Sequence, residues 1–132
     1  MRLLFDTSSI FKGLLMKRVH PLFGQTTLDL ARYELLNVIW KHSTLTKTLT
    51  PEEAEELVLY CIHTLDEMDT KTIKGYEDKI LKTAMQYRLP VYDSAYLSIA
   101  SENNCILVSE DLKQRKIAEL MGVISQSFEE IM

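Results

Sequence analysis

The stretch Cys105–Asp111, CILVSED, decides the fold class of this chain. Its first four residues form a short continuous apolar run, which is typical of a strand buried on both faces of a parallel sheet. A helical pattern follows as far as Met121, and Gly122 is well placed to end it. A strand that leads directly into a helix predicts an α/β unit with Asp111 at the carboxyl end of its strand.

The N-terminus repeats this pattern. The apolar run Leu3–Phe5 predicts a short buried strand that ends at Asp6, and a helix is expected over residues 10–18. Because ligands of such folds sit at the carboxyl ends of parallel strands, Asp6 and Asp111 are expected to share one edge of the sheet. Two hydroxyl residues could cap the N-terminal helix: Ser8 and Ser9.

The rest of the chain alternates between further strand and helix patterns. Thr50, Pro51 and Glu53 mark the clearest helix start, with an N-cap, a proline at the first position and a glutamate at the third. We expect a single α/β domain over residues 1–132, with a central, mostly parallel β-sheet flanked by α-helices. The other expected elements are a strand at 26–28, a helix at 30–42 buried on more than one side, a connection at 66–73 with room for a short strand, helices at 76–88 and 93–103 separated by a loop, and a last strand at 123–124.

Composition limits the classes of protein to which the chain can belong. Its 132 residues, 46% apolar and 26% charged, suit one soluble domain. No apolar stretch approaches the ~20 residues of a membrane span, and the N-terminal apolar run is too short for a secretory signal. We therefore expect a cytoplasmic protein without a membrane contact. For Cys61 and Cys105 a disulfide is possible in principle, but two buried reduced thiols fit that compartment better.

Four acids are candidates for a common site. Asp93 begins a predicted helix and Glu34 lies early in another, so both could reach the edge expected for Asp6 and Asp111. The net charge of −4 argues against binding of nucleic acid by bulk charge. The chain has 19 acidic and 15 basic residues, so the excess of four negative charges equals the charge of these four acids. A bound cation could neutralise that cluster.

Physical chemistry explains why such acids would gather. Carboxylates a few ångströms apart repel each other, and without compensation one of them stays protonated. Mg²⁺ or Mn²⁺ supplies the compensation, because these hard cations take oxygen ligands and retain waters. The four acids could hold one ion or two. Each also has a simpler explanation: Asp6 and Asp93 as helix caps, Glu34 on an exposed stripe, and Asp111 as the neighbour of an equally acidic Glu110.

Four blocks of the sequence resemble the PIN-domain superfamily, and within it most closely the compact VapC-type toxins. Their order, spacing and overall length all fit, so the resemblance spans nearly the whole chain. The third and fourth blocks are the most specific, although Ser109 stands where threonine is commoner. The blocks are LFDTS at 4–8, ARYELLNV at 31–38, VYDSAYLSIA at 91–100 and CILVSEDLK at 105–113.

The resemblance implies a metal-dependent ribonuclease that cuts RNA internally, as the toxin of a VapBC-type toxin–antitoxin pair. Asp6, Glu34, Asp93 and Asp111 would be the catalytic metal ligands for Mg²⁺ or Mn²⁺. Ser8 and Ser109 would hydrogen-bond these acids or a substrate phosphate. The implied partners are an RNA substrate, a cognate VapB-like antitoxin and a second copy of the chain in a homodimer.

Alternatives remain open at this point. The chain could be a PIN-fold binding module that no longer cuts, or an RNA-processing nuclease outside any toxin–antitoxin pair. A haloacid-dehalogenase-type phosphatase is disfavoured, because Asp6-Thr7-Ser8 lacks the second acid that opens that family. Residues 44–88 match no motif. Basic residues around Asp93 and Asp111 could contact phosphates or form a solvated face. The aromatic residues Tyr33, Trp40 and Tyr96 are interpreted as core or interface residues.

Overall fold

A five-stranded parallel sheet organises the computed structural model, which describes all 132 residues. The strand order is β3-β2-β1-β4-β5, and every neighbouring pair is parallel. This confirms the predicted α/β class, with a sheet that is wholly rather than mostly parallel. The strands are β1 (Leu3–Phe5), β2 (Thr26–Leu28), β3 (Asp69–Lys71), β4 (Ile106–Val108) and β5 (Ser125–Gln126).

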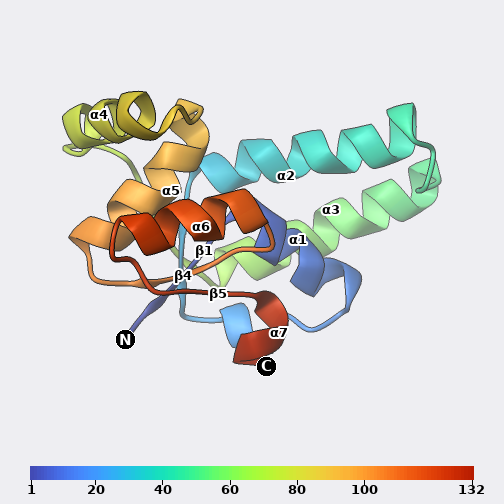
Figure 1. The fold of residues 1–132 in the computed structure, drawn as a ribbon. Coiled ribbons are helices and arrows are strands. Elements are labelled where there is room, and N and C mark those ends of the chain that lie inside the picture. Colours follow the sequence, from blue (N-terminus) through green and yellow to red (C-terminus); the bar gives the residue numbers. More distant parts are fainter.

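Seven α-helices connect and cover these strands. Figure 1 shows α2 and α3 packed side by side and reaching well beyond the sheet, with α4 and α5 on the opposite side of the molecule. A 3₁₀ turn precedes β2 and a π-helical turn follows α2. The helices are α1 (Thr7–Leu15), α2 (Leu30–Trp40), α3 (Pro51–Asp66), α4 (Glu77–Tyr87), α5 (Val91–Glu102), α6 (Leu112–Leu120) and α7 (Phe128–Ile131); the turns are His20–Leu22 and Lys41–Leu45.

The two central strands are buried on both faces, as their continuous apolar sequences predict. Leu4 and Leu107 belong to a core formed with α4, α5 and α6. Phe5 and Val108 belong to a second core formed with α1, α2, α3 and α7. Successive side chains of a strand point to opposite faces, so β1 and β4 each contribute to both cores. This packing holds the carboxyl ends of the two strands in register.

Three expectations about the elements are wrong. Helix α5 begins at Val91 rather than Asp93, because Pro90 occupies the N-cap position, where a proline does not interrupt the helix. The last strand lies at 125–126 rather than 123–124, because Val123 is buried in the core at the end of α6. Helix α1 spans Thr7–Leu15 rather than 10–18, because the side chain of Asp6, and not that of Ser8 or Ser9, caps its start. No expectation covered α7.

Helix α2 is buried on one face only, which corrects the expectation that it is buried on several. Its fully or nearly buried residues are Ala31, Leu35 and Ile39. Tyr33 is 77% exposed and Trp40 is 48% exposed, so neither is a core residue. Part of α2 is therefore an exposed surface rich in large apolar side chains.

Both cysteines, Cys61 and Cys105, are free and buried, in agreement with the interpretation as reduced thiols. Burial raises the pKa of the Cys61 thiol to about 11, which makes it a poor nucleophile. None of the helices has the length and apolar character required to span a bilayer.

Candidate active site

All four predicted acids line one cavity of about 550 Å³ at the carboxyl ends of β1 and β4. The fold brings them together from widely separated positions: Asp6 follows β1, Glu34 lies on α2, Asp93 lies in the first turn of α5, and Asp111 follows β4. The other lining residues are Thr7, Ser8, Phe11, Val38, Lys41 and Tyr96.

Asp6 is both a helix cap and a wall of this cavity. Its Oδ1 accepts hydrogen bonds from the backbone N–H of Ser9 at 3.0 Å and from Ser8 Oγ at 2.7 Å. Burial raises the pKa of Asp6, and hydrogen bonds from Ser109, Ser8 and Ser9 act against that rise. The capping interpretation and the site interpretation of Asp6 are therefore compatible.

The two serines of the predicted site connect the ends of β1 and β4. Ser8 Oγ lies 3.4 Å from Ser109 Oγ and accepts the backbone N–H of Glu110 at 2.9 Å. Ser109 Oγ accepts the backbone N–H of Asp111 at 3.1 Å. These bonds hold the loop that carries Asp111 against the start of α1, so the relative position of Asp6 and Asp111 is well defined.

Glu34 is held by two hydroxyl groups that the sequence analysis missed. Thr7 Oγ1 donates to Glu34 Oε1 at 2.7 Å, and the Tyr96 hydroxyl donates to the same oxygen at 2.9 Å. Burial and the neighbouring Glu34 carboxylate both raise the pKa of Tyr96, so its hydroxyl remains a neutral donor. A buried tyrosine needs a partner for its hydroxyl, and Tyr96 lies one helical turn after Asp93. That spacing is the signal that could have identified it.

Asp93 experiences repulsion from the other acids. Its pKa is raised, first by burial and then by Asp111 and Glu34, while Lys113 acts in the opposite direction. Asp111 itself is exposed, and its Oδ1 caps α6 by accepting the backbone N–H groups of Lys113 at 2.9 Å and Gln114 at 3.3 Å. Two carboxylates, those of Asp111 and Glu34, thus repel the Asp93 carboxylate across the cavity.

The contacts of Glu110 show which of the two neighbouring acids, Glu110 or Asp111, faces the cavity. Glu110 Oε1 accepts the backbone N–H of Phe128 at 2.6 Å, which ties α7 to the loop after β4. Glu110 does not line the acidic cavity, whereas Asp111 does. Asp111 is therefore the acid of this pair that lies with Asp6, Glu34 and Asp93 around the cavity.

The donor chemistry of the cavity suits Mg²⁺ or Mn²⁺, but the ligands are not assembled around one point. Four carboxylates face a common space, and a cation there would relieve the repulsion at Asp93. No three acidic, histidine or cysteine side chains are grouped closely enough to hold an ion as they stand. Binding would therefore require rotation of side chains such as Asp93 and Asp111, and metal ligation by the four acids stays a prediction.

Two lysines lie near the acids. Lys41 lines the cavity and makes no ion pair, and Lys113 is close enough to Asp93 to lower the pKa of that residue. Most other basic residues are engaged elsewhere. Lys12 pairs with Glu129 at 3.5 Å rather than reaching the acidic cavity, and the remaining pairs are Arg2 and Lys71 with Asp69, Arg32 with Asp66, Lys79 with Glu102, Lys82 with Asp78, and Arg115 with Glu130.

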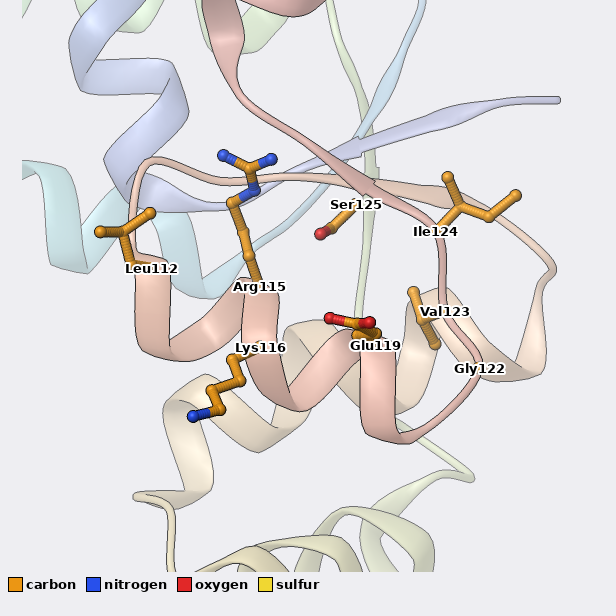
Figure 2. A pocket seen from close by; sticks show the side chains of 8 residues that line it. All are labelled: Leu112, Arg115, Lys116, Glu119, Gly122, Val123, Ile124 and Ser125. Carbon is orange, nitrogen blue, oxygen red and sulfur yellow. The ribbon is translucent and has the colours of Figure 1, made fainter.

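A larger hollow, of about 620 Å³, lies between α6 and the segment around β5 (Figure 2). Glu119 is its one acidic lining residue, so it offers no cluster of carboxylates. Arg115 is paired with Glu130 at 2.8 Å, and the side chain of Lys116 points away from Arg115 in Figure 2. Because its charged groups do not converge, this hollow is a poorer candidate for chemistry than the acidic cavity.

Comparison with known proteins gives similarity of structure but not of sequence. No family model matches the chain, and no curated protein matches it either. The crystal structure of PAE2754 from Pyrobaculum aerophilum matches with a TM-score of 0.79 and 20% identity, over 95% of this chain and 90% of that one. A chain of VapBC2 from Rickettsia felis, in a crystal structure bound to a DNA fragment from their promoter, matches with a TM-score of 0.60 and 14% identity, over 96% and 98%. These matches show a shared fold along nearly the whole of each chain.

Proposed function

This chain has a PIN-like fold similar to that of VapC proteins, and from that premise we propose that it is a ribonuclease dependent on Mg²⁺ or Mn²⁺. The observation that carries the proposal is the convergence of Asp6, Glu34, Asp93 and Asp111 on one cavity. The reaction would be endonucleolytic hydrolysis of RNA. Carboxylates gathered in this way are costly unless a cation is part of the site.

The residues of the cavity have separable roles in this proposal. The four carboxylates would hold the cation, which when bound supplies positive charge for polarising a phosphate and for lowering the pKa of a water molecule. Thr7 and Tyr96 orient Glu34 through its Oε1, and no hydrogen bond occupies Oε2. Lys41 and Lys113 lie where they can contact the phosphates of an RNA strand.

Cleavage is expected to require the metal. The purified wild type should cut an unstructured RNA with Mg²⁺ or Mn²⁺, lose this activity in excess EDTA, and regain it when Mn²⁺ exceeds the chelator. Gel analysis of end-labelled RNA measures the rate and shows whether the cuts are internal. Cleavage that persists in EDTA would contradict a metal-dependent mechanism.

Tyr96→Phe is expected to weaken Mn²⁺ binding by roughly 10- to 100-fold, because groups that orient metal ligands typically contribute that much. The variant removes one of the two donors to Glu34 Oε1 and leaves the buried ring in place. Titration calorimetry measures the dissociation constant. Tyr60→Phe is the matched control, since the hydroxyl of this half-buried tyrosine makes no hydrogen bond. Equal Mn²⁺ affinity in Tyr96→Phe and wild type would show that the Tyr96 hydroxyl does not position a metal ligand.

A VapB-like antitoxin and a homodimer are further parts of the proposal. Their support is the fold shared with VapBC2, a toxin–antitoxin complex by its name. A small reading frame beside the gene for this chain, whose product binds the chain and blocks cleavage, is the expected finding. If no such neighbour exists and cleavage is observed, the RNA-processing alternative is the better one. Sedimentation velocity tests the homodimer.

The absence of three closely grouped ligands favours a second candidate, a PIN-fold binding module that does not cut. The two functions differ in their response to metal. If calorimetry detects no Mn²⁺ binding by the wild type and several RNAs remain intact, the binding module is the correct function. Metal-dependent cleavage of RNA, with both Mn²⁺ binding and cleavage lost in the Asp93→Asn variant, would exclude it.

A further inference from the structure

A second hollow, of about 430 Å³, adjoins the acidic cavity and shares a wall with it. Thr7, Glu34, Val38 and Lys41 line both spaces. We infer that this second hollow binds an unpaired base of single-stranded RNA beside the bond to be cut. The inference rests on the proposed ribonuclease function and adds a base-binding subsite to it. The remaining lining residues are Leu30, Tyr33, Asn37 and Tyr92.

Two exposed tyrosines from different helices line this hollow. Tyr33 on α2 is 77% exposed and Tyr92 on α5 is 58% exposed. Each directly precedes one of the acids in the sequence, Glu34 or Asp93. Because the first turn of α5 begins at Val91, Tyr92 stands on regular helix rather than on the expected loop. Aromatic side chains that extend from regular helices are suitable for stacking against a base.

Polar groups complete the hollow along the same face of α2. Asn37 lies one helical turn after Tyr33, and Lys41 lies one turn further, so the three side chains form a row. The Asn37 side chain makes no hydrogen bond within the protein, which leaves its amide donors and acceptor available to the edge of a base. Lys41 lines both spaces and can bind the phosphate attached to that base. A phosphate held by Lys41 would therefore lie next to the acidic cavity.

The charge of the chain agrees with recognition by stacking. At a net charge of −4, long-range attraction contributes little to RNA binding. Stacking on aromatic rings does not depend on net charge, and only an unpaired base can offer its face to a protein. The hollow therefore suits an unpaired base rather than a base within a duplex.

A protein partner is the competing occupant of this surface. Leu36 and Trp40 on α2 are 50% and 48% exposed, and they lie outside the hollow. A partner that covered α2 would bury Tyr33 together with them. The experiment must therefore measure RNA binding and oligomeric state on the same variants.

The test uses a short unstructured RNA that carries one 2-aminopurine, whose fluorescence falls when it stacks on an aromatic ring. Wild type in EDTA, and Asp93→Asn with and without Mn²⁺, should all quench the probe. Tyr33→Ala and Tyr92→Ala are each expected to raise the dissociation constant about tenfold or more. The conservative variants Tyr33→Phe and Tyr92→Phe should bind as the wild type does. Leu59→Ala is the matched control, because Leu59 is an exposed residue of α3 that lines neither space.

Several results would overturn the subsite. The first two are a probe that is not quenched and an RNA affinity that is the same in the wild type and both alanine variants. The third is binding of a duplex of the same sequence as tightly as the single strand. The fourth is loss of a dimer in Tyr33→Ala without a change in RNA affinity. Failure of the subsite is distinguishable from failure of the nuclease. Metal-dependent cleavage with KM unchanged in both alanine variants rejects the subsite alone, whereas tyrosine-dependent quenching without cleavage supports the subsite and rejects the nuclease.

Discussion

Asp93→Asn is expected to abolish metal-dependent cleavage and to make the metal-free protein more stable. Asparagine is nearly isosteric with aspartate but carries no charge, so the variant loses a metal ligand and also the repulsion from Asp111 and Glu34. Gln114 Nε2 donates to the backbone oxygen of Asp93 at 2.9 Å, so this link between α5 and α6 is retained. We expect the cleavage rate to fall by a factor on the order of 100 or more and the melting temperature in EDTA to rise by roughly 2–5 °C.

The stability gain should depend on pH with a definite sign. The pKa of Asp93 is higher in the folded than in the unfolded chain, so the folded state takes up the proton more readily. Below the ordinary pKa of an aspartate, the wild type is protonated in both states and should resemble Asp93→Asn. As the pH rises through the raised pKa of the folded state, the wild type loses stability relative to the variant. Melting curves of both proteins from acid to neutral pH measure this gap.

Asp78→Asn is the matched control for both measurements. Asp78 is exposed on α4, pairs with Lys82 at 2.8 Å and does not line the acidic cavity. Its substitution should leave cleavage intact and should not raise the melting temperature. If Asp93→Asn cut RNA as fast as this control, Asp93 would not be a metal ligand, and the proposed site would need a different set of acids.

Phe128→Ala is expected to lower the free energy of unfolding by about 3–5 kcal/mol, the range for removal of a buried phenylalanine ring. Phe128 is fully buried although it begins a helix of only four residues. Its ring packs edge-on against Phe5, with centroids 6.4 Å apart. It also lies against α1, where a Cβ added to Gly13 would be 2.9 Å from Phe128 Cε2. The ring therefore occupies space that α1 leaves open by having a glycine.

Urea unfolding of Phe128→Ala and the wild type measures this effect. Met132→Ala is a suitable control, because Met132 is near Phe128 in sequence but 49% exposed, and its truncation should have a small effect. A loss below about 1 kcal/mol for Phe128→Ala would mean that α7 is not packed against α1 and β1 in solution.

The sequence predicted the central elements because their signals are local and strong. Cys105–Val108 is apolar without interruption, and Thr50 and Glu53 form the expected capping box at the start of α3. β5 was misplaced because Ser125 and Gln126 are polar residues at the edge of the sheet, while the apolar Val123 packs at the end of α6. A strand at an edge needs little apolar sequence, so hydrophobic patterning alone does not mark it.

The site was predictable only in part for a similar reason. Asp6 and Asp111 stand at junctions between strands and helices, positions that a parallel sheet brings to one edge. Thr7 and Tyr96 have no such positional signal, because their contacts to Glu34 depend on how α1, α2 and α5 pack. The exposure of Tyr33 was unpredictable because apolar residues occur all around α2, which hides the face that is buried.

The double role of Asp6 and Asp111 has an evolutionary consequence. Each side chain caps the helix that follows it, α1 or α6, besides facing the cavity. A change to alanine would remove the cap, at a typical cost of ~1 kcal/mol, together with any chemistry. Asparagine and serine cap helices well but lack the carboxylate. Descendants of this gene that abandon catalysis yet retain the fold should therefore drift to Asn or Ser at these two positions, whereas Glu34 and Asp93, which cap no helix, are free to change more widely.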